Sequence, residues 1–197
     1  MPALDRLASL TLATFLLCGL APAHALTADA PDRAGLRTCE PGPRADCSNA
    51  DLRFASLVGK DLQGAVFRGA DLSRADLRGA NLVGADFSDA IAVGADFSKA
   101  YLATAKFVHT DLTGAAMESA RMSKADFSGA RLYATNVSGA WAIGCNFTGA
   151  TLLNVDAQET KFSGSTFDKA AMHGTKIRFA LFSEVVYGSC EGCPRDW

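Results

Sequence analysis

Apolar residues recur at every fifth position through most of the chain. The centres of this pattern run in unbroken register from Leu52 and Leu57 to Phe182, with Ala two residues before most centres and Gly two residues after many of them. The unit is clearest in the segment Ala75-Asp76-Leu77-Arg78-Gly79. Each group of five residues therefore combines one small position, one large apolar position and one position suited to a turn.

A longer period of 20 residues is superimposed on the period of five. Phenylalanine recurs every 20 residues, and the same spacing runs back to Cys47 and forward to a tyrosine; we name the aromatic series the Phe ladder, and it comprises Phe67, Phe87, Phe107, Phe127, Phe147, Phe167 and Tyr187. The interval indicates that four groups of five residues make one structural repeat.

A period of five fits neither a helix nor a single strand. Five residues advance an α-helix by about 500°, which is about 140° away from the starting face, and residues i and i+5 of a strand point to opposite sides. The pattern instead predicts a chain that bends after every fifth residue, with Gly favoured at the corners. Four sides then close one coil, and the sequence predicts an all-β solenoid of about seven coils stacked at about 4.8 Å.

The positions on either side of each centre have separate roles in this fold. The Ala residues point inward with the centres, because a narrow and close-packed interior has no room for a second large side chain. The Asp or Asn that precedes many centres points outward near a corner, as at Asp71 and Asn81, where its side chain is expected to bond local backbone groups. We interpret these Asp and Asn residues as structural.

The run from Ala45 to about Gly188 resembles the pentapeptide-repeat protein family, whose motif is Ala-(Asp/Asn)-Leu-x-x. The resemblance implies the family's fold, a right-handed quadrilateral β-helix. Some members of the family are thought to mimic DNA and to bind type II topoisomerases through an acidic surface, which makes a cytoplasmic protein of that type an alternative to consider.

The remaining segments differ in composition. Residues 1–25 contain an apolar stretch from Leu7 to Leu20 followed by Ala23-His24-Ala25, which is typical of a secretory signal peptide. We expect cleavage before Leu26, no membrane span after cleavage, and a periplasmic or secreted protein. Residues 26–44 are interpreted as a linker and amino-terminal cap, residues 45–189 as the repeat array, and residues 190–197 as a carboxy-terminal cap or tail.

Four cysteines lie where the array begins and ends. Cys47 is at an inward centre next to Phe67 in the ladder, and a disulfide with Cys39 would hold the incoming segment over the end of the core. The alternative is that both cysteines are buried, unpaired thiols. An oxidising compartment favours the disulfide. Cys190-x-x-Cys193 is interpreted as a disulfide that closes the other end. A redox dithiol or half of a metal site is the alternative for this motif, although the βαβ scaffold that usually carries a redox pair is absent.

No other feature of the sequence indicates catalysis. His109 and His173 are about three coils apart, and the chain has no phosphate-binding loop, nucleophile elbow or dinucleotide fingerprint. We therefore predict a protein that is not an enzyme and has no catalytic residues, cofactor or metal. Residues 45–184 contain 15 acidic and 14 basic residues, too little net charge for a DNA mimic, and no basic groove for nucleic acid is present.

One outward column differs from the rest of the surface. Tyr101, Arg121, Trp141 and Lys161 follow one another at intervals of 20 residues, with Ile143 beside them. Aromatic and Arg side chains are enriched at binding hot spots, so this column is a candidate face for an unidentified protein partner or for self-association as a homodimer. The alternative is that Trp141 only covers the small centre Ala142.

These observations together predict a non-enzymatic, exported solenoid that acts as a protein-binding or scaffold module. The alternatives are the topoisomerase-interacting DNA mimic and a thiol-disulfide protein that uses Cys190 and Cys193.

Overall fold

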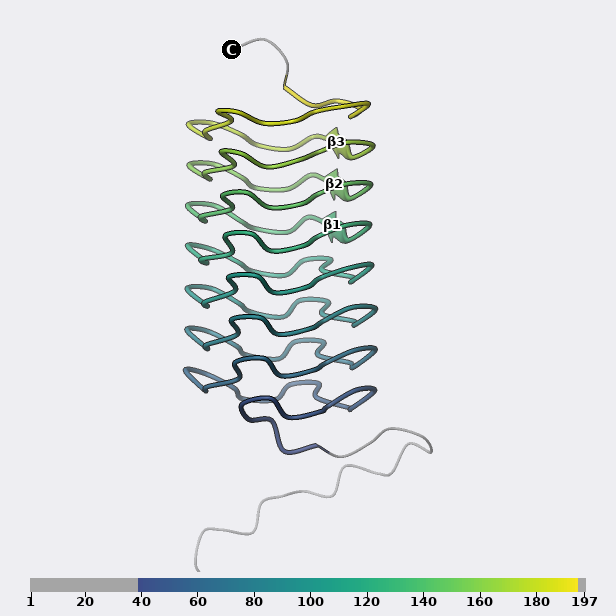
Figure 1. The fold of residues 1–197 in the computed structure, drawn as a ribbon, viewed down its shortest axis with the longest axis vertical. Coiled ribbons are helices and arrows are strands. Elements are labelled where there is room, and N and C mark those ends of the chain that lie inside the picture. The colour runs from purple at the N-terminus through teal and green to yellow at the C-terminus, as the bar shows by residue number, and fades with distance from the viewer. Residues whose placement is uncertain (1–38, 195–197) are drawn as a thin grey trace, which may run out of the picture. The chain divides into compact units, whose positions relative to one another are not determined.

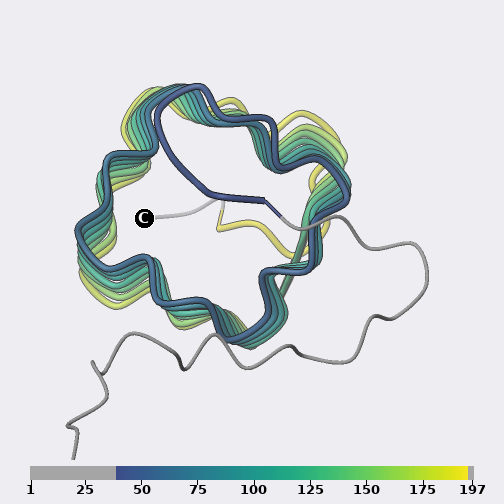
Figure 2. The ribbon, with the colours of Figure 1, turned by 90° about the horizontal axis from the view of Figure 1, so that it is seen from below.

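The computed structural model describes residues 39–194, and these form one four-sided β-helix. Figure 1 shows the coils stacked along one axis, and Figure 2 shows that they superimpose as a quadrilateral when viewed down that axis. The predicted signal peptide and most of the predicted linker lie outside the described residues. The solenoid predicted from the five-residue period is confirmed.

Each coil pairs in parallel with the coil 20 residues further on. The outward residue before each centre makes the bridge, from Asp46 with Val66 to Ala171 with Glu191. Three bridges on one side extend into short strands, β1 (Arg131–Tyr133), β2 (Thr151–Leu153) and β3 (Ala171–His173), which form a parallel sheet in the order β1-β2-β3. The N–H of each centre donates to the next coil, as from Phe127 to the carbonyl of Asn146 at 2.7 Å.

The corners are tight turns with a left-handed residue two positions after each centre from Cys47 to Phe182. The N–H three residues beyond most centres donates back to the carbonyl of the centre, as from Ala130 to Phe127 at 3.0 Å. The residue before that donor has a positive φ, as a type II turn requires. Non-glycine residues also occupy this position, including Phe54 at a φ of 60° and His109 at 55°. The repeated turn thus imposes a conformation that glycine adopts at lower cost.

The centres and the small inward residues form one continuous core. Adjacent rings of the Phe ladder from Phe67 to Phe167 stack with centroids 4.8–5.0 Å apart and planes within 14° of parallel. Phe97 enters from the opposite side and meets two ladder rings edge-on at 5.6 and 5.7 Å. Its neighbour in the coil is the small centre Ala92, and Phe162 has the same relation to Ala157, so large rings lie beside the smallest centres.

Several inward positions carry a hydroxyl where most coils have Ala. Thr110, Thr135 and Thr160 donate to the centre carbonyl of the coil before, at 2.7–2.8 Å, and the same bond is made by Ser165 and Thr175. These buried hydroxyls are therefore satisfied, as buried polar groups must be. Next to β1, β2 and β3 the inward residues are Thr135, Val155 and Thr175, whose branched side chains favour extended backbone.

The outward Asp and Asn residues bond the backbone locally, as the sequence predicts. Asp71 accepts from the N–H of Ser73 at 3.0 Å, and Asn136 accepts from the N–H of Ser138 at 2.9 Å. The contact repeats along the array between the Oδ1 atom and the N–H two residues on. Each such side chain fixes the entry into a corner, which is a structural role.

The two ends of the array are closed by different means. The first described segment crosses the end of the solenoid (Figure 2), and Cys47 lies buried beneath it. At the other end Glu191 starts a further coil by bridging to Ala171. The last complete coil is only partly covered, because Ile177 and Tyr187 are partly exposed whereas the equivalent centres in the middle of the array are fully buried.

Candidate functional site: an aromatic and basic ridge

The cysteines at the ends of the array are paired as disulfides. Cys39 and Cys47 have Cα atoms 5.3 Å apart, and Cys190 and Cys193 have Cα atoms 5.8 Å apart, both within the usual range for disulfides. Each bond joins residues close in sequence at one end, so the two disulfides act as local braces on the terminal coils.

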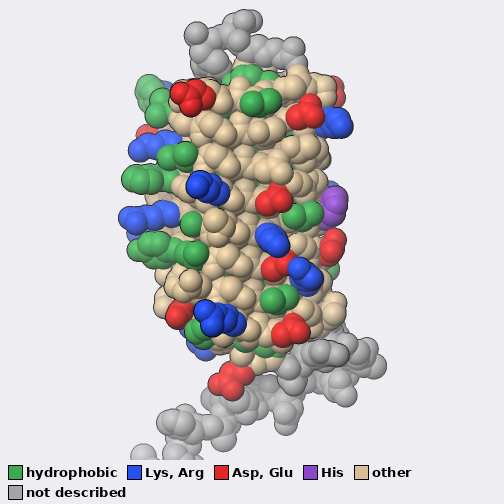
Figure 3. Space-filling model, in the orientation of Figure 1, with side chains coloured by type: hydrophobic (Ala, Val, Ile, Leu, Met, Phe, Trp, Pro, Cys, Tyr) green, Lys and Arg blue, Asp and Glu red, His purple; other side chains and the backbone are tan. Residues whose placement is uncertain are grey.

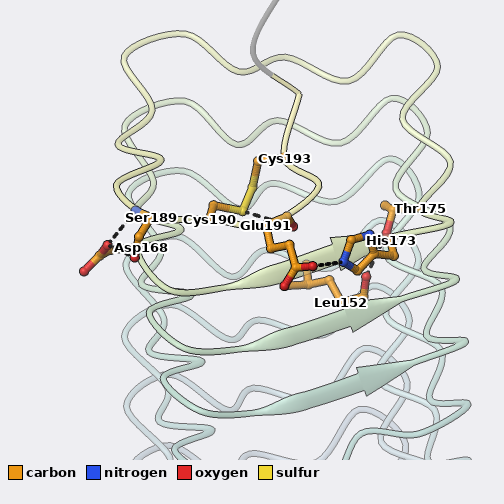
Figure 4. The surroundings of a disulfide bond; sticks show 8 residues. All are labelled: Leu152, Asp168, His173, Thr175, Ser189, Cys190, Glu191 and Cys193. Carbon is orange, nitrogen blue, oxygen red and sulfur yellow. Dashed lines mark hydrogen bonds and ion pairs between the residues drawn. A yellow bond between two sulfur atoms is a disulfide. The ribbon is translucent and has the colours of Figure 1, made fainter.

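The carboxy-terminal brace is supported by polar contacts to the preceding coil (Figure 4). Asp168 accepts hydrogen bonds from the N–H and hydroxyl of Ser189 at 2.9 and 3.2 Å, and the first of these holds the pKa of Asp168 below its usual value. Glu191 lies 3.5 Å from Nε2 of His173. The disulfide is thus held against the last coil as part of the cap.

Cys145 is the free cysteine of the described residues, and it is buried in an Ala position. Burial raises the pKa of its thiol to about 12. Its Sγ atom lies 2.8 Å from the carbonyl of Met122, the same contact that the inward hydroxyls make. A thiol in this state is a packing residue and has little nucleophilic character.

The described residues contain no group of three or more His, Cys, Asp or Glu side chains placed to hold a metal ion. A pocket of about 150 Å³ lies at the carboxy-terminal end, and none of its lining side chains titrates; it is lined by Met172, Gly174, Thr175, Ile177, Gly192 and Pro194. Within residues 39–194 no helix is long and apolar enough to cross a membrane.

The column that the sequence singled out is continuous in the structure. Parallel bridges join Tyr101 to Arg121, Arg121 to Trp141 and Trp141 to Lys161, so the four side chains project from successive coils of one side. Tyr101 and Trp141 are 44% and 47% exposed. Alternating hydrophobic and basic side chains of this kind project at the left edge of the view in Figure 3.

The cations in this column lie against the ring faces. The guanidinium carbon of Arg121 is 5.2 Å from the ring centroid of Tyr101 and 5.8 Å from that of Trp141, and Nζ of Lys161 is 4.4 Å from the Trp141 centroid. Such cation–π contacts stabilise exposed side chains by about 0.5–1 kcal/mol each. They order four long side chains that would otherwise move independently.

The structure extends this column beyond the four predicted residues. Parallel bridges continue the column from Tyr101 back to Asn81 and Asp61. At the other end they continue it from Lys161 to the exposed Leu181. We name the whole column the ridge, and its members are Asp61, Asn81, Tyr101, Arg121, Trp141, Lys161 and Leu181. Sequence reasoning missed its ends, although the 20-residue spacing already placed Asp61 and Leu181 in register.

A second outward column lies two residues along each coil from the ridge. Ile143 in this column is 40% exposed and Val83 is partly exposed. Ala142, between Trp141 and Ile143, is fully buried and lies in register beneath Phe162 of the next coil. Trp141 itself projects, so about half of its surface is available for contact.

Several charges near the start of the array are paired within the chain. Nε and Nη2 of Arg68 lie 2.8 and 2.7 Å from Oδ2 of Asp86, and Arg78 contacts Asp76 through two hydrogen bonds. These contacts lower the pKa of Asp76, chiefly through the hydrogen bond from Arg78. Burial by itself raises the pKa of Asp86, but hydrogen bonds from Arg68 and Ser88 outweigh it and leave the pKa lowered.

The geometry therefore defines an all-β solenoid whose distinctive surface is the ridge. Comparison with known proteins identifies its family: the pentapeptide repeats model matches residues 45–82, 80–118, 110–149 and 145–184, and the chain belongs to this family. The fold is accordingly the right-handed quadrilateral β-helix of pentapeptide-repeat proteins. Members of the family are generally structural or binding proteins.

Solved structures of the same family resemble the chain. HetL, a pentapeptide repeat protein involved in heterocyst differentiation regulation in Nostoc sp. strain PCC 7120, is 25% identical over 73% of this chain and 81% of its own, with a TM-score of 0.34. A pentapeptide repeat protein of the Arabidopsis thaliana thylakoid lumen is 37% identical over 51% of this chain and 66% of its own, with a TM-score of 0.38. QnrB1, a plasmid-mediated fluoroquinolone resistance protein, is 20% identical over 68% of this chain and 83% of its own, with a TM-score of 0.30. No curated protein matches the sequence.

Proposed function

We propose that the protein is a non-enzymatic, exported scaffold module that binds another protein molecule through the ridge. The observation that carries this proposal is the ordered stack of Tyr101, Arg121, Trp141 and Lys161 on a flat side of the solenoid. Export rests on the apolar stretch and the Ala23-His24-Ala25 segment of residues 1–25.

The scaffold supports this function through its rigidity. Every coil is bonded to its neighbours through the backbone, and the core beneath the ridge is continuous. A binding surface built on such a frame loses little conformational entropy when a partner docks. The ridge side chains are further ordered by their mutual contacts.

The DNA-mimic alternative is not favoured by the charge of the array. The 15 acidic and 14 basic residues of positions 45–184 nearly cancel, whereas DNA carries one negative charge per about 1.7 Å of duplex axis. The thiol-disulfide alternative is not favoured either. Cys190 and Cys193 are joined to each other in the cap, and the pocket beside them is lined by no titratable side chain that could activate a thiol.

Site-specific photo-crosslinking tests the proposal. A photoreactive amino acid at Ile143, beside the ridge, should yield adducts with a second protein molecule in the compartment to which the protein is exported. The matched control replaces Tyr133 on the opposite side, which is 42% exposed. Equal adduct yields at both positions, or none at Ile143, would show that the ridge is not a binding face.

A further inference from the structure

The basic residues of the ridge have no carboxylate partner among residues 39–194, in contrast to three arginines near the start of the array. Arg53, Arg68 and Arg78 each lie against an Asp, whereas the cationic groups of Arg121 and Lys161 lie over aromatic rings. The positive charge of the ridge is therefore available to a carboxylate from outside the chain.

The ridge also contains a carboxylate that Lys161 cannot reach. Asp61 accepts a hydrogen bond from Nδ2 of Asn81 at 2.9 Å and is exposed. Asp61 and Lys161 are five coils apart, which corresponds to about 24 Å at the spacing of paired strands. Within one molecule the two charges cannot meet.

We propose that the partner of the ridge is the ridge of a second copy of this chain, packed antiparallel around a two-fold axis. The two-fold axis lies in the plane of the interface and is perpendicular to the long axis of the solenoid. It passes midway between the coils of Tyr101 and Arg121. In this register Lys161 of each copy faces Asp61 of the other, Arg121 faces Tyr101, and Trp141 faces Asn81. A two-fold interface makes each pairing twice.

The neighbouring column fits the same register. A two-fold axis in this orientation keeps each column opposite itself and reverses its order, so Ile143 of one copy faces Val83 of the other. Ala103 faces Ser123 close to the axis, where small side chains leave room for the large ridge residues. No two like charges oppose each other in either column.

Two other arrangements of the ridges are less complementary. A parallel dimer places Arg121 against Arg121 and Lys161 against Lys161. An antiparallel dimer shifted by one coil so that Trp141 faces Tyr101 again brings the two Arg121 side chains together and places Lys161 opposite Asn81. Like charges placed opposite each other disfavour both of these interfaces.

The proposed interface is modest and partly electrostatic. Six coils along one flat side give a contact about 24 Å tall. The surface buried over this height is small compared with that of stable complexes. The two Lys161–Asp61 pairs lie near the rim, where ion pairs between exposed groups are weakened by salt. The dimer should therefore be reversible and should dissociate more readily as ionic strength rises.

Charge reversal with reciprocal rescue tests this inference. Sedimentation equilibrium of the exported protein should show a monomer–dimer equilibrium, and Lys161→Glu should raise the dimer dissociation constant by at least about tenfold, because it places Glu opposite Asp61 twice. Combining Lys161→Glu with Asp61→Lys should return the constant to within about threefold of the unmodified protein. Lys106→Glu, the same charge change on another side, is the control and should leave the constant unchanged.

The inference would be overturned by a protein that stays monomeric at millimolar concentration, by a dimer insensitive to Lys161→Glu, or by a double variant that does not recover. It rests on the proposed function, and the two fail differently. If the protein is monomeric while the photoreactive residue at Ile143 still captures another protein, the partner assignment is wrong and the binding function stands. If Ile143 captures nothing, the binding function itself is wrong.

Discussion

Truncation of one ring in the Phe ladder should destabilise the array strongly. Phe127 is fully buried between Phe107 and Phe147, with ring centroids 4.8 and 5.0 Å away and planes within 6° of parallel. Phe127→Ala removes a whole ring from this stack. Large-to-small changes of buried Phe cost about 3–5 kcal/mol in the free energy of unfolding.

The structure places the expected loss in the upper part of that range. The N–H of Phe107 donates to the backbone carbonyl of Asp126 at 2.6 Å, and the N–H of Phe127 donates to the backbone carbonyl of Asn146 at 2.7 Å. These bonds fix the spacing of the three coils, so the rings on either side cannot close over the missing one. We therefore expect a loss of about 4–5 kcal/mol.

Chemical denaturation followed by circular dichroism measures this loss. The control is Phe54→Ala, because Phe54 is 68% exposed at a corner, where the guanidinium of Arg74 lies over its ring at 5.7 Å. Its truncation should cost less than about 1.5 kcal/mol. Because coils interact only with their neighbours, Phe127→Ala should also broaden unfolding or divide it into two stages. Equal losses for the two variants would refute the assignment of inward and corner positions.

Three further predictions concern pH, thiol reactivity and processing. Asp86→Asn should lower the free energy of unfolding by about 1 kcal/mol at neutral pH. Because the pKa of Asp86 is lowered in the folded protein, this difference between the two proteins should be complete above about pH 4 and should vanish on further acidification. Urea titrations at several pH values would measure it. Cys145 should resist alkylation in the native protein and react once denatured, as mass spectrometry would detect; rapid labelling in the native state would contradict its burial. Mass spectrometry of the exported protein should find an amino terminus at or within a few residues of Leu26, whereas an intact Met1 in a cytoplasmic product would favour the DNA-mimic alternative.

The sequence predicts the fold because a five-residue period has one simple structural solution. It does so despite corners such as Phe54 and His109, since the tight turn recurs whether or not Gly is present. The contribution of Phe97 to the core is harder to predict. The 20-residue period assigns Phe97 to the side opposite the Phe ladder, but only the packing across the coil shows that its ring contacts the rings of Phe87 and Phe107.

The ridge was only partly predictable for a related reason. The 20-residue spacing aligns Tyr101, Arg121, Trp141 and Lys161, but it does not show that the cations lie on the ring faces. The pairing of Arg68 with Asp86 links residues 18 positions apart and depends on side-chain rotamers. Contacts of this kind follow from three-dimensional packing and have no signature in the repeat itself.

The central claim is that the ridge makes intermolecular contact without being needed for the fold, and truncation of Trp141 tests it most directly. In protein carrying the photoreactive residue at Ile143, Trp141→Ala should abolish most of the adducts. The melting temperature should stay nearly unchanged, because Trp141 points outward and its cation–π contacts are with exposed side chains, which stabilise little. Undiminished adducts, or a large fall in melting temperature, would contradict the account and show that Trp141 serves mainly to cover the coil at Ala142.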